Sequence, residues 1–324
     1  MKKCLDSLLV GGDDVEIIIV NDGSTDDTLS IAREYERDHA SVVRVIDKPN
    51  GGHGSGVNAG LAVATGLYYK VVDSDDWLNT DALKTLLDTI KANIASGTDI
   101  DLYITNFVYS RYDGDRSMRF VKNFPTNKVF DWREAKPLKG GHMLLMHSLV
   151  YNTERLRMSN TVLPEHTFYV DNLFAYKPLP FMRTVYYLDI DMYMYYIGRP
   201  DQSVSMNNMI ARYEQQMRVM ELMLYSYTFD ELRKMCKGLR KIMYHCLEVI
   251  MLNTAFFTTA KYSGERKRQY NRMWNKLKQA DKKLYKKLKH HSLVCLLNFF
   301  TFRGKGRVTT ISYKLLCRRL HLGA

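Results

Sequence analysis

Three acidic side chains, Asp73, Asp75 and Asp76, end an apolar, β-rich run in the sequence YYKVVDSDDW. Open α/β sheets bind their ligands at the C-terminal ends of strands. Hard cations such as Mg²⁺ and Mn²⁺ take oxygen ligands and share them with substrate phosphates. Such carboxylates also occur as ordinary turn residues or helix caps, and we expect Asp76 to cap the helix that follows it.

A second apolar run, at residues 15–20, also leads to an acidic residue. The run EIIIV is typical of a strand that is buried on both faces, and Asp22 follows it in NDGSTDDT. Gly23 permits a tight turn, and the Ser, Thr and Asp residues after it are good caps for the helical stretch LSIAREYERD. We therefore expect Asp22 to lie at the same sheet edge as Asp73.

Between these two runs lies a glycine-rich loop, NGGHGSGVNAG, at residues 50–60. Glycines let backbone N–H groups approach a ligand closely. The loop also contains the dinucleotide pattern Gly54-x-Gly56-x-x-Ala59, but that motif requires glycines directly after a strand, and three residues intervene here. An EF-hand interpretation of DSDDWLNTDALK fails because its sixth position is not glycine and its twelfth is not glutamate.

These motifs resemble those of family 2 glycosyltransferases, whose nucleotide-sugar domain has the GT-A fold. Residues 163–177, LPEHTFYVDNLFAYK, are similar to the acceptor-side segment that carries the family's catalytic carboxylate. Residues 186–205, YYLDIDMYMYYIGRPDQSVS, resemble the closing strand and the polar loop over the diphosphate. The resemblance covers roughly residues 1–205. It implies an α/β GT-A domain with a Rossmann-like, mostly parallel sheet, followed by an α-helical region over residues 206–324.

The resemblance also implies roles for individual residues. Asp171 is the expected general base, which takes the proton of the acceptor hydroxyl, and direct displacement by that hydroxyl inverts the anomeric centre. Asp75 is expected to hold Mg²⁺ or Mn²⁺ against the donor diphosphate. The expected nucleotide-sugar contacts are Asp22, Gly23, Ser24, Asn58, Asp73, Arg199, Gln202 and Ser203. The alternative for Asp171 is an N-cap of the helix FAYK, and we interpret His142 and His147, which bracket an expected apolar strand MLLM, as structural.

Two features depart from the family pattern. Members normally begin with a strand of the type SIIIPVYN, whereas residues 1–9 correspond to the helix after it. We therefore expect a gap or a shifted pairing in the sheet. Val57 stands where many members carry arginine, which leaves the nucleotide base open. The alternative function is a catalytically inactive scaffold or assembly partner at the membrane. The presence of Asp171 together with Asp73 and Asp75 argues against it, because a binding module has no chemical need for these three acids.

Composition agrees with a large globular chain that carries a basic appendage. The 324 residues are 46% hydrophobic, with a formal net charge of +12. Lysines and arginines are concentrated at residues 261–290. The Met and Tyr residues after residue 206 recur at helical spacing, which predicts core positions. Five scattered cysteines without metal-type spacing indicate a reducing compartment.

The apolar segment SLVCLLNFFTF, at residues 292–302, is too short for a membrane span, which needs about 20 residues. Basic stretches flank it on both sides, as in helices that lie on anionic lipid, although packing on the protein's own core is the alternative. We expect a UDP-sugar donor, a glycan or lipid-linked acceptor, and a peripheral, cytoplasmic location on the inner face of the cell membrane. The family suggests a role in cell-surface polysaccharide synthesis. The basic tail has no nucleic-acid-binding signature, so no nucleic-acid partner is expected.

Overall fold

The computed structural model describes residues 1–111, 114–138, 142–197, 206–261, 263–302, 304–308 and 310–311. The chain divides into two compact units. The first contains Met1–Lys136 and Leu144–Tyr196, and the second contains Pro137–Met143 and Ile197–Ala324. The expected donor contacts Arg199, Gln202 and Ser203 lie outside the described residues, as does residue 205, the predicted end of the first domain.

Two strands of the first unit, β1 (Ile17–Asp22) and β2 (Val43–Lys48), pair in parallel and form a sheet of their own. They are connected by α2 (Thr28–Asp38). The strand predicted from EIIIV is confirmed. The C-terminal ends of β1 and β2 are in register, with Asp22 opposite Lys48, so the acidic end of β1 has a basic neighbour on the adjacent strand.

The larger sheet of the first unit has the order β3-β8-β5-β9-β4, with β6 beside β5 and β7 beside β9. Its strands are β3 (Tyr68–Tyr69), β4 (Trp77–Leu78), β5 (Leu102–Ser110), β6 (Arg116–Met118), β7 (Val129–Phe130), β8 (Leu149–Asn152) and β9 (Val185–Tyr196). β5 and β9 are parallel, and the other described pairs are antiparallel. The sheet is thus mixed, and the expected parallel pairing is limited to β1–β2 and β5–β9. Hydrophobic periodicity reports which strand faces are buried and carries no information on strand direction.

Within the described residues, neither β1 nor β2 pairs with a strand of the larger sheet. The helix α1 (Lys2–Leu9) contacts both sheets instead. Its Leu5 packs against the buried face of β1 and β2, and its Ser7 side chain accepts a 3.0 Å hydrogen bond from the backbone N–H of Leu78 in β4. This separation of the sheets is the gap in strand pairing that we expect from the sequence.

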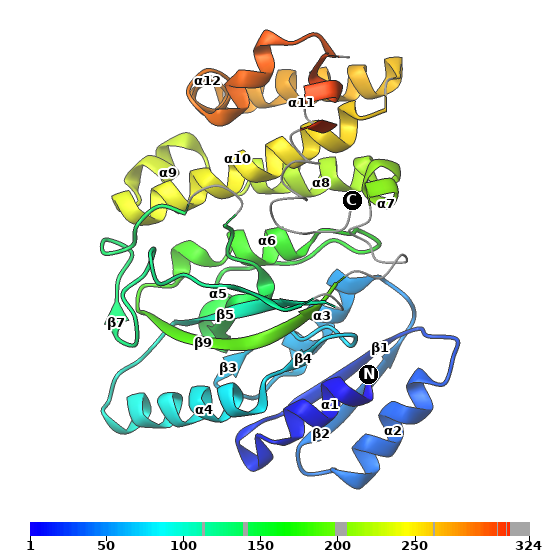
Figure 1. Ribbon diagram of the computed structural model, residues 1–324, viewed down its shortest axis with the longest axis vertical. Helices are drawn as coiled ribbons and strands as arrows, with labels where there is room; N and C mark the ends of the chain where they lie inside the picture. Colours follow the sequence, from blue (N-terminus) through cyan, green and yellow to red (C-terminus); the bar gives the residue numbers. More distant parts are fainter. Residues whose placement is uncertain are drawn as a thin grey trace. The chain divides into compact units, whose positions relative to one another are not determined.

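Helices lie on both sides of the larger sheet. Figure 1 shows α4 (Thr80–Ala95) on one side and α6 (Asp171–Tyr176) on the other. Two further helices follow strands or loops directly: α3 (His53–Val63) begins at the glycine-rich loop, and α5 (Thr153–Met158) follows β8. Short 3₁₀ turns lie at η1 (Gly12–Asp14), η2 (Met146–Ser148) and η3 (Leu179–Phe181). The strand expected for MLLM is wrong, because its last residue opens η2.

The described part of the second unit is largely helical. Its elements are α7 (Met206–Ala211), α8 (Tyr213–Leu224), α9 (Phe229–Lys234), α10 (Lys237–Thr259), α11 (Gly264–Ala280), α12 (Lys282–His290) and η4 (Leu293–Phe299). Several methionines of α8 and α10 are buried, which confirms their predicted core positions: Met217, Met220, Met223, Met243 and Met251. Among the described residues, no helix is both long enough and apolar enough to cross a membrane.

Candidate active site

The carboxylate of Asp22, at the end of β1, is held by the protein itself. Its Oδ1 accepts hydrogen bonds from Lys48 Nζ at 2.6 Å and from the Gly51 N–H at 2.9 Å, and its Oδ2 accepts from the Gly52 N–H at 2.6 Å. Burial raises the pKa of Asp22, but these donors outweigh it and the pKa ends below its ordinary value. Asp22 therefore anchors the glycine-rich loop.

Two glycines shape the backbone at this edge. Gly23 has a φ of +72°, and a Cβ there would lie 2.8 Å from the Asn50 backbone nitrogen. Gly52 has a φ of +82° and lies against the backbone of His166. Side chains are rarely tolerated in such conformations, so both positions favour glycine. The neighbouring Ser24 is exposed, and its N–H donates to the side chain of Asn21 at 3.3 Å.

Asn58 joins the glycine-rich loop region to the acceptor-side segment. Its amide nitrogen donates to the Leu163 carbonyl at 2.8 Å, and its amide oxygen accepts from the Leu163 N–H at 3.0 Å. A further bond runs from the His166 N–H to the Gly51 carbonyl at 2.7 Å. The two segments that the sequence assigns to donor and acceptor binding therefore lie side by side, and Asn58 acts here as their connector.

Asp73 lies at the centre of the candidate site. Its Oδ1 is 3.0 Å from Nε2 of His53, the first residue of α3, and its N–H donates to the Tyr193 hydroxyl at 3.1 Å. Burial raises the pKa of Asp73, but the hydrogen bond and charge of His53 and the Tyr193 hydroxyl together hold it below its ordinary value. Asp73 is therefore ionised at neutral pH.

The other two acids of DSDDW occupy different environments. Asp75 is exposed at the tip of the loop. Asp76 is buried, and its two oxygens accept from the Tyr193 hydroxyl at 2.7 Å and from the Tyr196 N–H at 2.8 Å. Burial raises the pKa of Asp76 to about 7, and the charges of Asp73 and Asp75 add to this effect. The expected helix-cap role is wrong for Asp76, because the side chain of Asn79 caps α4.

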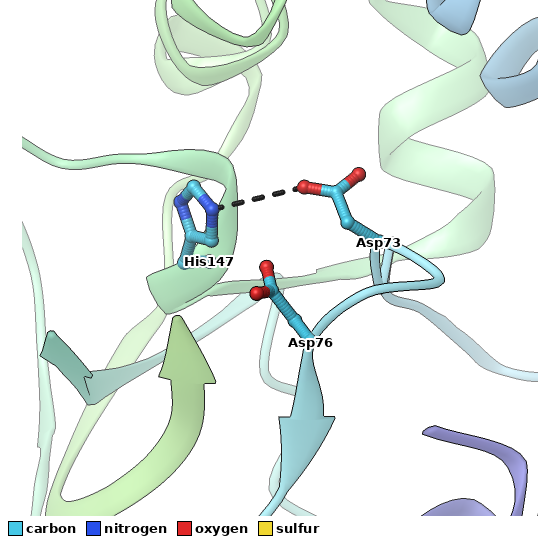
Figure 2. Close-up of side chains that lie close together, drawn as sticks. All are labelled: Asp73, Asp76 and His147. Atoms are coloured by element: carbon cyan, nitrogen blue, oxygen red, sulfur yellow. Dashed lines mark ion pairs between the residues drawn. The ribbon is translucent and has the colours of Figure 1, made fainter. Parts of the chain in front are cut away.

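His147, which we interpreted from sequence as structural, is buried next to these acids. Its ring stacks on Tyr195 at 4.4 Å and meets Tyr193 edge-on at 4.5 Å between centroids. Its Nε2 is 3.8 Å from Asp73 Oδ2, and neither ring nitrogen has a hydrogen-bond partner within the described residues. Burial lowers the pKa of His147 to about 4, so the imidazole is neutral. Figure 2 shows Asp73, Asp76 and His147 facing one another.

Lys70 is a second functional candidate that the sequence did not reveal. Its Nζ donates to the backbone carbonyl of His147 at 2.7 Å and lies 5.1 Å from the centre of the Tyr193 ring. Burial lowers the pKa of Lys70 to about 7, although the negative charge of Asp73 opposes the shift. No local sequence pattern distinguishes Lys70 or His147, since their environment depends on contacts between distant segments.

Asp171 is the first residue of α6. The N-cap of that helix is Val170, so the interpretation of Asp171 as the cap is wrong. Burial raises the pKa of Asp171, the charge of Asp73 raises it further, and the charge of His53 opposes both. The loop before it holds Tyr169 at a φ of +67° and His166 at +48°. Such strained non-glycine residues cluster at functional sites.

Three of the expected acids influence the pKa of one side chain, His53. Protein around the ring lowers its pKa, but the hydrogen bond that His53 makes to Asp73 and the charges of Asp73, Asp171 and Asp22 outweigh this effect, and the pKa ends above its ordinary value. Three acids from three separate elements therefore act on the same imidazole. Asp75, by contrast, lies on the exposed side of the loop.

Sequence comparison assigns this arrangement of motifs to a family. Residues 1–153 match the sequence family described as Glycosyl transferase family 2. Residues 1–153 therefore belong to glycosyltransferase family 2. Among its relatives, the putative glycosyltransferase EpsH of Bacillus subtilis is 28% identical over 242 residues, which cover 69% of this chain and 63% of EpsH. The chondroitin synthase of Pasteurella multocida is 38% identical over 107 residues, which cover 33% of this chain and 11% of that protein. The chain therefore matches less than two thirds of the length of these relatives.

Solved structures show the fold of the chain. The crystal structure of S. aureus TarS residues 1–349 in complex with UDP-GlcNAc has a TM-score of 0.62 and 19% sequence identity to this chain. The likeness covers 97% of this chain and 87% of the TarS chain. The α/β GT-A fold expected from the sequence, with a helical C-terminal region, is confirmed.

Proposed function

We propose that the protein is an inverting, metal-dependent glycosyltransferase that moves a sugar from a nucleotide diphosphate donor to a glycan or lipid-linked hydroxyl. The observation that carries this proposal is that Asp73 contacts His53 at 3.0 Å, directly after the glycine-rich loop residues Gly51 and Gly52 that Asp22 holds. Family membership supports the reaction class. A UDP-sugar is the proposed donor, in line with the UDP-GlcNAc bound by TarS. A role in cell-surface polysaccharide synthesis agrees with the chondroitin synthase among its relatives.

Asp171 is the proposed general base. The electrostatic influence of His53 and Asp73 on the pKa of Asp171 supports this role. Its raised pKa makes the carboxylate a better proton acceptor than an ordinary aspartate. Once the acceptor hydroxyl has lost its proton to Asp171, its oxygen displaces the nucleotide diphosphate from the opposite side, which inverts the anomeric centre.

The proposed donor contacts divide between two edges of the site. Asp73 would accept hydrogen bonds from the ribose, and the turn formed by Asp22, Gly23 and Ser24 would lie beside the base. Asp22 and Asn58 contribute mainly by holding the glycine-rich loop and the acceptor-side segment in place. The proposed diphosphate contacts Arg199, Gln202 and Ser203 complete the set. Val57 is buried, so its side chain adds no contact to the nucleotide.

Asp75 is the proposed ligand of Mg²⁺ or Mn²⁺. Its exposed position at the tip of the loop leaves it accessible to an ion that arrives with the donor diphosphate. Such an ion neutralises the charge that develops on the leaving diphosphate. The neighbouring Asp73 and Asp76 hold the loop against β9 through Tyr193, which keeps Asp75 at the edge of the site.

We further propose that the second unit binds the anionic inner face of the cell membrane. In η4, Val294 and Leu297 are buried, whereas Phe299 is 82% exposed, so one face packs on the protein and the other faces outward. The preceding helix α12 buries Leu284 and Leu288 and exposes lysines. Apolar side chains beside exposed lysines are typical of a surface that binds anionic lipid.

The sugar-transfer proposal is tested by a donor screen. Nucleotide release is measured with UDP-sugars and with other nucleotide sugars, each in the presence of Mn²⁺ or Mg²⁺. We expect release with a UDP-sugar, dependent on the ion and reduced in Asp75→Asn. If no donor binds or turns over, the inactive scaffold becomes the better interpretation.

The membrane proposal is tested by co-sedimentation with vesicles. We expect binding to vesicles that contain phosphatidylglycerol and little binding to pure phosphatidylcholine. Phe299→Asp should reduce binding severalfold, because it places a charge where an apolar ring would enter the bilayer. Phe181→Asp, at a partly exposed phenylalanine of the first unit, is the matched control. Equal binding of the two variants would refute the role of η4.

A further inference from the structure

His147 is a buried polar side chain that the proposed transfer reaction does not use. It is 5% exposed, and neither ring nitrogen finds a hydrogen-bond partner among the described residues. Buried imidazole nitrogens are ordinarily paired with protein or water, so an unpaired ring indicates a group that it would bind. The ring is held in place by the aromatic side chains of Phe107, Tyr193 and Tyr195.

Two carboxylates face this ring. One ligand atom each from Asp73, Asp76 and His147 lies within 4.8 Å of the other two (Figure 2). Ligand atoms about 2.1 Å from a bound ion lie about 3 to 4 Å apart, so small side-chain rotations would close the set around an ion. The three residues come from the DSDDW loop and from η2, which are distant in sequence.

The surrounding contacts orient the two carboxylates. His53 occupies Oδ1 of Asp73, which leaves Oδ2 facing His147. The Tyr193 hydroxyl and the Tyr196 N–H fix the two oxygens of Asp76. Each carboxylate oxygen has two lone pairs, so Asp76 retains capacity for a further ligand. Hydrogen-bonded ligands of this kind are typical of metal sites, where neighbouring groups set the ligand geometry.

We propose that Asp73, Asp76 and His147 bind one divalent transition-metal ion in the absence of nucleotide, at a site separate from Asp75. An imidazole nitrogen with two carboxylate oxygens suits Mn²⁺, Co²⁺ or Zn²⁺, whereas Mg²⁺ prefers oxygen ligands alone. The site therefore selects transition metals over Mg²⁺. This binding does not depend on sugar transfer, although Asp73 is shared with the proposed ribose contact.

The test is a Co²⁺ titration of the full, metal-stripped chain without nucleotide, followed by visible absorption and calorimetry. We expect one equivalent to bind with a visible d–d band, and a large excess of Mg²⁺ to leave the band in place. His147→Phe should weaken binding by more than about tenfold, and so should Asp76→Asn. Phenylalanine suits the aromatic surroundings of His147, so the variant should keep its fold, which circular dichroism checks.

Two variants serve as controls. His39→Gln removes an exposed histidine of the same unit and should bind Co²⁺ as the unaltered protein does. Asp75→Asn should also retain the nucleotide-free band. Unchanged affinity in a folded His147→Phe variant would overturn the proposal and leave His147 as a packing residue. Loss of the band in Asp75→Asn but not in His147→Phe would assign the ion to Asp75 instead.

The outcome is separable from that of the donor screen. A chain that binds Co²⁺ through His147 but releases no nucleotide from any donor supports this ion site and counts against the proposed function. A chain that transfers sugar but shows no nucleotide-free Co²⁺ site supports the proposed function and overturns this inference.

Discussion

Asp22 and Asp76 both lie at strand ends of the first unit, yet the protein surrounds their carboxylates in opposite ways. Asp22 receives an ammonium group and two backbone N–H groups, and its pKa is lowered. Asp76 receives a phenol and one backbone N–H in a buried position, and its pKa is raised to about 7. At Asp22 the donors outweigh the effect of burial on the pKa, whereas at Asp76 burial outweighs the donors.

This difference suggests a division of labour between the two regions. The region around Asp22 is satisfied by the protein alone and holds the glycine-rich loop. The region around Asp73, Asp76 and His147 keeps buried polar groups without full partners, which lowers stability unless a ligand binds there. Real proteins accept such local costs mainly at functional sites. Variants in these two regions should therefore affect different properties of the protein.

The largest effect is expected for Asp171→Asn, and it is an effect on turnover. The amide cannot take a proton from the acceptor, so turnover should fall by about 10²- to 10⁴-fold. The dissociation constant of the donor and the melting temperature should change little, because Asp171 caps no helix. Initial rates and calorimetric donor titration check this. An equal loss of donor binding would contradict the base role.

Asp22→Ala should act on stability instead. It leaves Lys48 and the N–H groups of Gly51 and Gly52 without their acceptor, which costs about 1–3 kcal/mol of unfolding free energy. Urea unfolding without donor measures the change. Asp38→Ala, at an exposed residue whose one ion pair among the described residues is with its neighbour Arg37, is the control and should cost much less. Equal costs would show that Asp22 is no anchor.

His147→Phe should not lower the free energy of unfolding as Asp22→Ala does. It removes two unpaired ring nitrogens from an aromatic environment, so the metal-free protein should be unchanged or stabilised by up to about 1 kcal/mol. Urea unfolding in the presence of a chelator checks this. A loss of stability as large as that of Asp22→Ala would mean that the two regions are equally satisfied, and the comparison would fail.

The smallest effect is a shift in the pH dependence of turnover. Asp171 must be ionised to act as base, and its pKa lies above the ordinary value, so activity should fall as pH drops through that raised pKa. The charge of His53 lowers the pKa of Asp171. His53→Gln should therefore move the acidic limb of kcat/KM to higher pH, while His39→Gln should leave it in place. A shift to lower pH would contradict this arrangement.

The sequence alone located the acids after predicted strands and the glycine-rich loop, because these depend on local order and spacing. The resemblance of its motifs to family 2 glycosyltransferases implied the GT-A fold. The sequence correctly predicted that β1 ends in Asp22 and that the methionines of the second unit are buried. It misjudged Asp76 and the segment around His147, since both depend on burial by distant residues.

Only the tertiary structure decided the direction of the strands and the surroundings of each polar group. Packing of η2 against β9 places His147 between Tyr193 and Tyr195 and beside two carboxylates from a distant loop. The physical reason is that ionisation and metal affinity depend on which groups are buried next to one another, away from water. Sequence periodicity reports the burial of a face, and it says nothing about what that face meets.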